Sequence, residues 1–436
     1  MVKERISATV EKETVERIER ILKEGKFRNK YFEPLQDILE TKGKSIFWIL
    51  VFVYIDGGSF RDSLKTARKM ARMGEKIIFL EEFLGVKEIF VGFFLWLAQI
   101  VKYLFLEKKF DDEMLCGGTL SPSCIPIIQD LWRRSFCGLE ALRGLMNYLA
   151  FFKAFASIPQ QKRCIYCCEM QGWEKAMISA GQRVRPEMET IGYQHTCVSR
   201  NYLFYVHSSS EVETSKMRDG LPLPHTLASN GRLAWESFKR CGYEGLIELE
   251  AIRYQAVSDI LDRCSRPSGE LPVLLLVGSI VLEETRALIS MVHDSMPLPG
   301  QWEIWLKGHP SMPIDGILLD LAIDPDSLRW NIKEGDISSF LKKADIAMVP
   351  TSSVAVEALA YGCEVVVPVS SSIFPMSPLT GFNNTYSTVH SPEELVAALD
   401  GYLRKVPKMD LEEKRSFVRN YWHLDSSLPR WKQILS

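Results

Sequence analysis

Residues 345–368 read DIAMVPTSSVAVEALAYGCEVVVP, and this stretch decides the predicted fold. A short apolar strand over 345–349 leads into a loop rich in hydroxyl groups and then into a helix over 353–361. Gly362 closes that helix, and a second apolar strand follows over 365–368. Strands that alternate with helices in this way predict a parallel sheet in which the helices are the crossover connections.

The same alternation extends upstream. The apolar run 271–278, LPVLLLVG, is typical of a strand buried on both faces, and a helix is expected over 282–293. A strand over 302–306 and a helix over 338–343 complete the series. The C-terminal half therefore predicts a doubly wound, Rossmann-like sheet with helices on both faces.

The N-terminal half repeats this pattern with additional helices. Residues 46–54, IFWILVFVY, predict a buried strand, and 127–155, after Pro126, predict one long helix. Strands at 164–168 and from 190, separated by a helix over 172–180, indicate a second α/β unit.

We therefore expect an α/β protein of two domains and a C-terminal helix. The polar segment 263–270, RCSRPSGE, is the predicted linker. The N-terminal domain is predicted over 1–265 and the C-terminal domain over 271–405. The last part, 406–436, is expected to form a helix over 411–435 that packs back toward the N-terminal domain.

Composition narrows the classes of function. The chain has 436 residues, 46% of them hydrophobic and 25% charged, with a formal net charge of -2. Nucleic-acid-binding proteins usually carry a basic excess, so this class is disfavoured. The ten cysteines lack the paired spacing of a zinc site, and free thiols in a reducing cytoplasm are expected. No metal site is predicted.

One segment is unusually apolar. Residues 89–106 read IFVGFFLWLAQIVKYLFL, slightly short for a membrane span and interrupted by Gln99 and Lys102. A buried or inter-domain helix, a helix in contact with the membrane interface and a true span all remain open. The charged N-terminus carries no secretory signal, so the expected location is cytoplasmic, with possible peripheral contact with the inner face of the membrane.

Polar residues follow three strands of the C-terminal half, where parallel α/β sheets bind ligands. Gly278 and Ser279 end the first apolar run. The next strand ends in Lys307-Gly308-His309-Pro310, in which Pro310 fixes the turn and presents His309 at the edge of the sheet. A histidine there can donate to a phosphate oxygen, although an isolated His-Pro is also common as a plain turn.

The third strand ends in Thr351-Ser352-Ser353 at the start of the helix over 353–361. Hydroxyl groups and backbone N–H groups at a helix start can bind an anion, although a serine there is also an ordinary helix cap. Glu357 follows one turn later on the same face, where it can accept from ribose hydroxyls.

The strand ending in KGHP and the later PTSSVAVEALAYGCEVVVP together resemble the donor half of GT-B glycosyltransferases over about residues 270–400. They are most similar to bacterial sialyltransferases and Kdo transferases, which use CMP-activated sugars. The resemblance implies two domains that face a central cleft. It also implies that His309, Ser352 and Ser353 contact the donor phosphate and cytidine. His309 is also a catalytic candidate, and the other predicted donor-binding residues are Gly278, Ser279, Lys307, Pro310, Thr351 and Glu357. Polymerases that use CDP-glycerol share a similar pair of motifs.

The N-terminal half more loosely resembles bacterial surface-polysaccharide proteins through YCCEMQGWE (166–174) and IGYQH (191–195). This implies that acceptor-side residues lie at successive strand ends, and the predicted ones are Glu174, Gln194 and His195. Glu169 is the candidate base for the acceptor hydroxyl. Asp56, which follows the strand over 46–54, is the rival base.

These features predict an enzyme that transfers a sugar, such as a sialic-acid-like or Kdo-like ulosonic acid, from a CMP donor to a surface glycan such as lipopolysaccharide or capsule. The expected partners are the nucleotide sugar and a glycan or lipid-linked acceptor, with no other cofactor. A CDP-glycerol-type phosphotransferase, a UDP-sugar transferase or epimerase, and an inactive binding protein remain alternatives.

Overall fold

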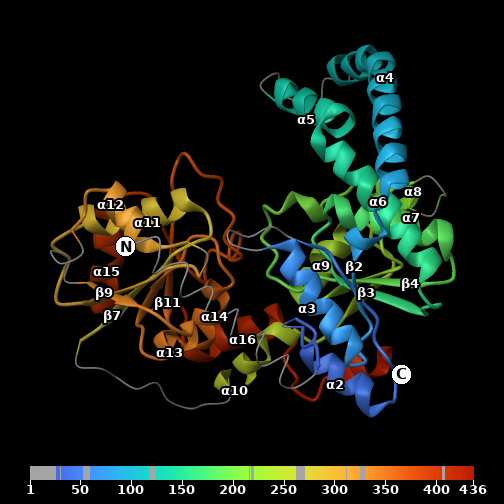
Figure 1. The fold of residues 1–436 in the computed structure, drawn as a ribbon. Coiled ribbons are helices and arrows are strands. Elements are labelled where there is room, and N and C mark those ends of the chain that lie inside the picture. Colours follow the sequence, from blue (N-terminus) through green and yellow to red (C-terminus); the bar gives the residue numbers. More distant parts are fainter. Residues whose placement is uncertain are drawn as a thin grey trace.

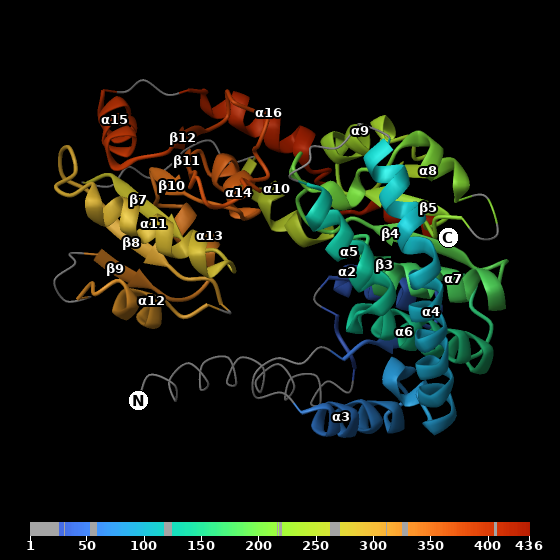
Figure 2. The ribbon, with the colours of Figure 1, turned by 90° about the horizontal axis from the view of Figure 1, so that it is seen from above.

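Two α/β units lie side by side in the computed structural model, which describes residues 26–29, 31–52, 59–116, 124–215, 217, 220–261, 271–310, 312–324, 330–404 and 408–436 (Figures 1 and 2). Strands β3 to β6 all precede residue 262, and β7 to β12 follow residue 270. The predicted linker over 263–270 lies outside the described residues.

The C-terminal unit is built on a six-stranded parallel sheet with the order β12-β11-β10-β7-β8-β9. The chain runs outward from β7 to β9 and then returns to the other side of β7. Its strands are β7 (Val273–Val277), β8 (Glu303–Lys307), β9 (Trp330–Lys333), β10 (Ile346–Met348), β11 (Glu364–Pro368) and β12 (Ser387–Val389). Its helices are α11 (Leu282–Asp294), α12 (Ile314–Asp320), α13 (Ile337–Leu341), α14 (Val354–Ala360) and α15 (Pro392–Leu403).

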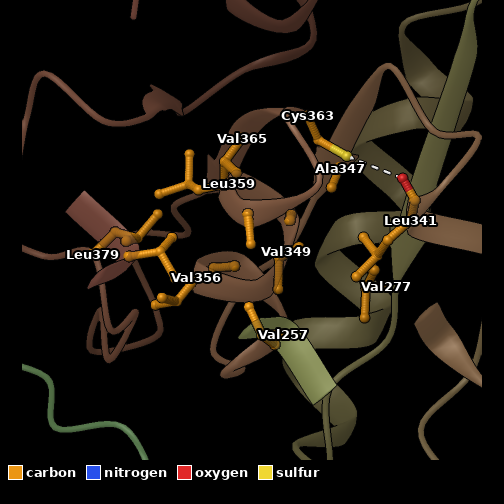
Figure 3. Close-up of a cluster of buried hydrophobic side chains, with 14 of the residues drawn as sticks. Val257, Val277, Leu341, Ala347, Val349, Val356, Leu359, Cys363, Val365 and Leu379 are labelled. Atoms are coloured by element: carbon orange, nitrogen blue, oxygen red, sulfur yellow. Dashed lines mark hydrogen bonds between the residues drawn. The ribbon is translucent and has the colours of Figure 1, made fainter. Parts of the chain in front are cut away.

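Alternate residues of β7 are buried in two different hydrophobic cores, one on each face of the sheet, as expected for a central strand. Leu274 and Leu276 pack with α11, α12 and α15. Leu275 and Val277 pack with α13 and α14 on the opposite face (Figure 3). The Cys363 thiol lies in this second core and donates to the Leu341 carbonyl oxygen at 3.5 Å. Helices cover both faces, so the predicted doubly wound sheet is confirmed.

The N-terminal unit has a four-stranded parallel sheet whose order, β3-β4-β5-β6, follows the chain. Its strands are β3 (Arg163–Cys167), β4 (Glu189–Tyr193), β5 (Thr226–Ser229) and β6 (Leu246–Glu248). One face packs against α6 (Leu139–Ser157), α7 (Gly172–Val184), α8 (Ser209–Thr214) and α9 (Arg232–Arg240). The other packs against α2 (Glu33–Thr41) and α17 (Pro429–Ile434). The predicted α/β class with two parallel sheets is therefore confirmed.

A small second sheet accompanies this unit. Strands β1 (Trp48–Leu50) and β2 (Ile77–Phe79) pair in parallel and flank α3 (Phe60–Arg72), and the short helix η1 (Leu80–Phe83) follows β2. The strand predicted over 46–54 is thus shorter than expected within the described residues.

Two predicted helices are divided in the structure. The helix predicted over 127–155 is α5 (Ile125–Cys137) followed by α6, because Gly138 between them is extended, with φ -79° and ψ 172°. The helix predicted over 411–435 is α16 (Leu411–Tyr421) and α17. Pro429 cannot continue a preceding helix, and Leu428 before it has a positive φ of 50°.

The C-terminal segment connects the two units. Helix α16 packs against α14 of one unit and α9 of the other. A Cβ on Gly231, at the start of α9, would lie 2.1 Å from the Tyr421 carbonyl oxygen, so only glycine permits this approach. Further on, the Glu250 carboxylate accepts from the backbone N–H groups of Arg430 at 2.9 Å and Trp431 at 3.1 Å, which holds α17 on the N-terminal sheet.

Helix α4 (Val86–Cys116) stands away from the N-terminal unit together with α5 and the start of α6 (Figure 1). Within the described chain, the stretch Val86–Glu107 is long and apolar enough to cross a membrane. Only 11% of the most hydrophobic part of this stretch is buried inside the structure. The buried alternative for this segment is therefore wrong.

Candidate active site

The reversal of strand order in the C-terminal unit occurs between β7 and β10. Crossovers leave in opposite directions at such a point, so a crevice opens beside the carboxyl ends of the two strands. Gly278 and Ser279 follow β7 at this edge, and Pro350 and Thr351 follow β10. The predicted donor-binding residues Ser279 and Thr351 therefore belong to one edge of the sheet.

Hydrogen bonds connect these loops to the first turn of α11. The Ser279 N–H donates to the Thr285 hydroxyl at 2.9 Å, and the Thr351 hydroxyl donates to Glu284 Oε1 at 2.6 Å. Glu284 is only 6% exposed, and its Oε2 has no hydrogen-bond partner among the described residues. A small cavity between α11 and the 369–377 loop adjoins Glu284 and Thr351. Glu284 is thus an acceptor at this edge that sequence reasoning missed.

Ser352, Ser353 and Glu357 lie at the start of α14. The Ser353 hydroxyl donates to Glu357 Oε1 at 3.1 Å, and Ser352 Oγ accepts from the Val354 N–H at 3.3 Å. Both serines are half-buried. Desolvation raises the pKa of Glu357, opposed by the Ser353 hydrogen bond and by the charge of Arg253. The predicted hydroxyl cluster is present, with one of its hydroxyls engaged by Glu357.

The KGHP turn follows β8, the neighbour of β7 on the other side. The Gly278 N–H donates to the Lys307 carbonyl oxygen at 2.8 Å, and Lys307 Nζ donates to the Gly308 carbonyl oxygen at 2.9 Å. A Cβ on Gly278 would lie 3.3 Å from both Gly308 Cα and the His309 nitrogen, so glycine allows the loops to touch. Burial, followed by the charge of Lys307, lowers the pKa of His309, which is therefore neutral near pH 7. Pro310 is exposed.

Glu174 shapes the loop after β3 in the N-terminal unit. Its side chain accepts from the backbone N–H groups of Glu169 at 2.9 Å and Met170 at 3.0 Å, one on each oxygen. Met170 has a positive φ of 57°, and Glu174 is 1% exposed, with a pKa raised by burial. The buried Glu174 carboxylate thus fixes the backbone at Glu169, and it is not itself accessible to an acceptor.

Glu169 and His195 come together at adjacent strand ends. His195 Nε2 lies 3.7 Å from Glu169 Oε1, and the Glu169 side chain is 48% exposed. His195 is buried, its ring packs edge-on against Tyr31 at 4.9 Å, and its Nδ1 has no hydrogen-bond partner within the described part of the chain. Burial, followed by the charge of Arg253, lowers the pKa of His195 to about 4. A neutral imidazole thus lies beside an accessible carboxylate.

Gln194 and Asp56 are the other two residues predicted for the acceptor side. Gln194 is fully buried, where its Oε1 accepts from the Asn230 N–H at 3.1 Å and its Nε2 donates to the Thr196 carbonyl oxygen. It connects the loops after β4 and β5, so its amide is occupied within the fold. Asp56, the rival base, lies outside the described residues.

Arg253 lies between the two units, in the short helix η3 (Ile252–Val257). It is exposed, and its guanidinium lies 5.8 Å from the ring centre of Tyr31 and 5.7 Å from that of Tyr254. Its charge lowers the pKa of His195 on one side and of Glu357 on the other. No carboxylate among the described residues forms an ion pair with Arg253.

Tyr202 is a second residue near both sides. Its pKa is raised by burial first and then by Cys197, Glu284 and Glu169. The tyrosine therefore lies within electrostatic reach of a carboxylate from each unit. No motif marks Arg253 or Tyr202 in the sequence, so only the three-dimensional arrangement identifies them.

Loops from the two units make direct contact beside this site. Asn201 Nδ2 donates to the Pro375 carbonyl oxygen at 2.6 Å, and the Arg200 guanidinium lies 5.0 Å from the centre of the Phe382 ring. These contacts bring the loop after β4 against the loop after β11. The two units are therefore in contact through these loops.

Within the described ranges, no group of three or more His, Cys, Asp or Glu side chains is arranged to hold a metal ion. The described cysteines are free thiols.

No protein-family model and no curated protein matches this chain. Among solved structures, a glycosyltransferase from Rickettsia africae aligns with a TM-score of 0.44 and 13% identity, covering 90% of this chain and 97% of that one. HepE from Anabaena in complex with UDP-glucose aligns with a TM-score of 0.39 and 10% identity, over 69% of this chain and 82% of that one.

A putative UDP-N-acetylglucosamine 2-epimerase from Listeria monocytogenes aligns with a TM-score of 0.42 and 11% identity, over 65% of this chain and 76% of that one.

Proposed function

We propose that this protein is a glycosyltransferase that uses a nucleotide-activated sugar. One observation carries the proposal. An accessible carboxylate beside a neutral histidine, Glu169 and His195, belongs to one unit and Glu357 to the other, and the charge of Arg253 acts on both His195 and Glu357. Proton removal on one side and binding of an anionic group on the other are the two tasks of sugar transfer from a nucleotide.

The donor nucleotide occupies the edge formed by the loops after β7, β8 and β10. The backbone N–H groups and the hydroxyls of Ser352 and Ser353 donate hydrogen bonds to the phosphate. The neutral His309 also donates a hydrogen bond to it. Glu357 accepts from the ribose. Arg253, exposed and without an ion-pair partner among the described residues, supplies the positive charge for the departing phosphate.

The reaction follows from this placement. The acceptor hydroxyl oxygen attacks the anomeric carbon of the sugar while its proton passes to the Glu169 carboxylate. The bond from that carbon to the phosphate oxygen breaks, and its electron pair leaves on the nucleotide. Glu174 keeps Glu169 in place, and His195 stays uncharged beside it.

Within this class, we propose a CMP-activated ulosonic acid as the donor and a surface glycan as the acceptor. Support comes from the sequence resemblance of KGHP at 307–310 and PTSSVAVEALAYGCEVVVP at 350–368 to sialyltransferases and Kdo transferases. A UDP-sugar, or CDP-glycerol in a phosphotransferase, is the competing donor.

The test is a panel of CMP-, UDP-, GDP- and CDP-activated donors with glycan and lipid-linked acceptors, read by nucleotide release and by the mass of the product. CMP release coupled to a product heavier by one ulosonic acid is the expected result. Transfer from a UDP-sugar would keep the class of enzyme and exclude the CMP donor. Binding of nucleotides without turnover of any donor would contradict the proposed transferase.

A further inference from the structure

Helix α4 packs against α5 and α6 along one side only. On the side that faces α6, Glu88 pairs with Lys153 of α6 at 2.9 Å, and within α4 the buried Tyr103 hydroxyl donates to Glu107 Oε1 at 2.8 Å. Gly92 lies on the same side, where a Cβ would meet the Met146 side chain at 2.7 Å. Glu88 thus connects α4 to α6.

The remaining surface of α4, around most of its circumference, is largely apolar and uncovered. Phe94 is 64% exposed, Leu104 66% and Phe105 80%. We call this set the outer face; its members are Ile89, Phe90, Val91, Phe93, Phe94, Leu95, Leu97, Val101, Leu104 and Phe105, all exposed. A surface helix normally buries its apolar side, so an uncovered apolar face of this length indicates a ligand.

The length and hydropathy of this face match a lipid surface. The stretch Val86–Glu107 has 22 residues and a hydropathy of 2.0 in its most apolar window. At a rise of about 1.5 Å per residue, it extends about 33 Å. Together with α5, it projects beyond the sheet of the N-terminal unit (Figure 1).

Charges on α5 and α6 decide how a bilayer would meet the helix. Glu140 and Arg143 of α6 and Arg133 of α5 are exposed, and these two helices pack against α4. A crossing hairpin would take those charges into hydrocarbon, which is costly. A helix lying in the plane of the interface keeps them on the aqueous side. Lys87 and Lys102 of α4 are exposed and can extend their ammonium groups to anionic headgroups.

We propose that α4 is a membrane-binding element whose outer face lies in the interface of one leaflet of an anionic bilayer, with α5 and α6 behind it in water. This mode of binding attaches the N-terminal unit to the lipid surface without crossing it. The attachment goes beyond the proposed transfer reaction and does not depend on it.

The test is flotation of the purified full chain with vesicles of phosphatidylethanolamine and phosphatidylglycerol, compared with vesicles of phosphatidylcholine alone. The chain is expected to float with the anionic vesicles, and the bound fraction is expected to fall as salt rises. The double variant Phe94→Glu/Phe105→Glu is expected to reduce partitioning by about tenfold or more.

Leu319→Glu is the matched control, because Leu319 of α12 is also 80% exposed but lies in the other unit. It is expected to float as the parent chain does. Circular dichroism and thermal unfolding of the double variant establish that its fold is retained, since the substituted side chains face away from the body.

Two results would overturn the proposal. One is flotation of the double variant equal to that of the parent chain. The other is a parent chain that does not bind vesicles but sediments as a dimer, while the double variant sediments as a monomer. In that case α4 would bind a second copy of the chain.

Discussion

The two larger sheets of this protein are both parallel and both covered by helices, yet they offer different sites. The C-terminal sheet, β12-β11-β10-β7-β8-β9, reverses its chain order beside β7, whereas the N-terminal sheet, β3-β4-β5-β6, never reverses. Reversal separates the crossovers on either side of one edge and leaves a crevice for a ligand. A sheet that continues in one direction leaves no such crevice.

The N-terminal unit must therefore form its site from individual loop residues. Glu169 takes its position from the buried Glu174, and His195 from the packing of Tyr31. We infer that the C-terminal edge binds the donor through many weak groups, whereas the N-terminal side acts through one carboxylate. This contrast makes the two sides separable by mutation.

The largest effect is expected for Glu169→Gln. Loss of the base should lower the rate of transfer by about 10²- to 10⁴-fold, with nucleotide affinity unchanged. Single-turnover kinetics with the active donor measure this. Glu213→Gln, at an exposed glutamate of the same unit, should retain full activity. An equal loss in both variants would remove Glu169 from the mechanism.

Arg253→Gln should affect both sides, because Arg253 lies between them. A charge-assisted hydrogen bond contributes about 1.5–3 kcal/mol, so the affinity for the nucleotide should fall by about 10- to 100-fold. Calorimetric titration gives that affinity. Arg240→Gln, at an exposed position at the end of α9, is the control. Unchanged affinity in the Arg253 variant would place the phosphate elsewhere.

Glu174→Gln tests how the N-terminal side is held. The amide can accept from only one of the two N–H groups that the carboxylate now satisfies, so a loss of about 1–3 kcal/mol in the free energy of unfolding is expected. Denaturant unfolding measures this loss. A reduced rate of transfer at unchanged nucleotide affinity should accompany it. Normal stability would show that the loop after β3 does not depend on Glu174.

The smallest effect concerns pH. The pKa of His195 is lowered from 6.5 to about 4, so the unfolded chain binds the proton more tightly than the folded chain does. The free energy of unfolding should therefore fall as pH falls from about 6.5 to about 4, and His195 should account for about 1–2 kcal/mol of the loss between pH 7 and 5. His195→Asn should flatten this part of the profile. An unaltered profile would show that the imidazole is not buried in its neutral form.

The same contrast explains how much could be predicted from the sequence. The C-terminal unit was predictable because β7, VLLLV, is buried on both faces and each strand ends at a recognisable turn such as KGHP. In the N-terminal unit, Glu169 and Glu174 look equivalent in sequence. Only the fold shows that Glu169 is half-exposed, whereas the Glu174 carboxylate accepts hydrogen bonds from two backbone N–H groups.

Other features depend on tertiary structure and could not be predicted from the sequence. Gly138 gives no sign in the pattern that it ends a helix instead of continuing it. Arg253 has meaning only because η3 lies between the two units. The apolar segment 89–106 left three interpretations open, and the exposure of α4 removes one of them.

The most direct test of the central claim, that the C-terminal edge binds the nucleotide and the N-terminal side does not, is a titration of the full chain with CMP and UDP. Thermal unfolding would be followed in parallel for the parent chain, His309→Ala and His293→Ala, the last at an exposed histidine of the same unit. The account predicts about 2.7 kcal/mol of stabilisation at a hundredfold excess over Kd, reduced by about 1–2 kcal/mol in His309→Ala and kept by His293→Ala. Full stabilisation of the His309 variant, or none of the parent chain by either nucleotide, would contradict it.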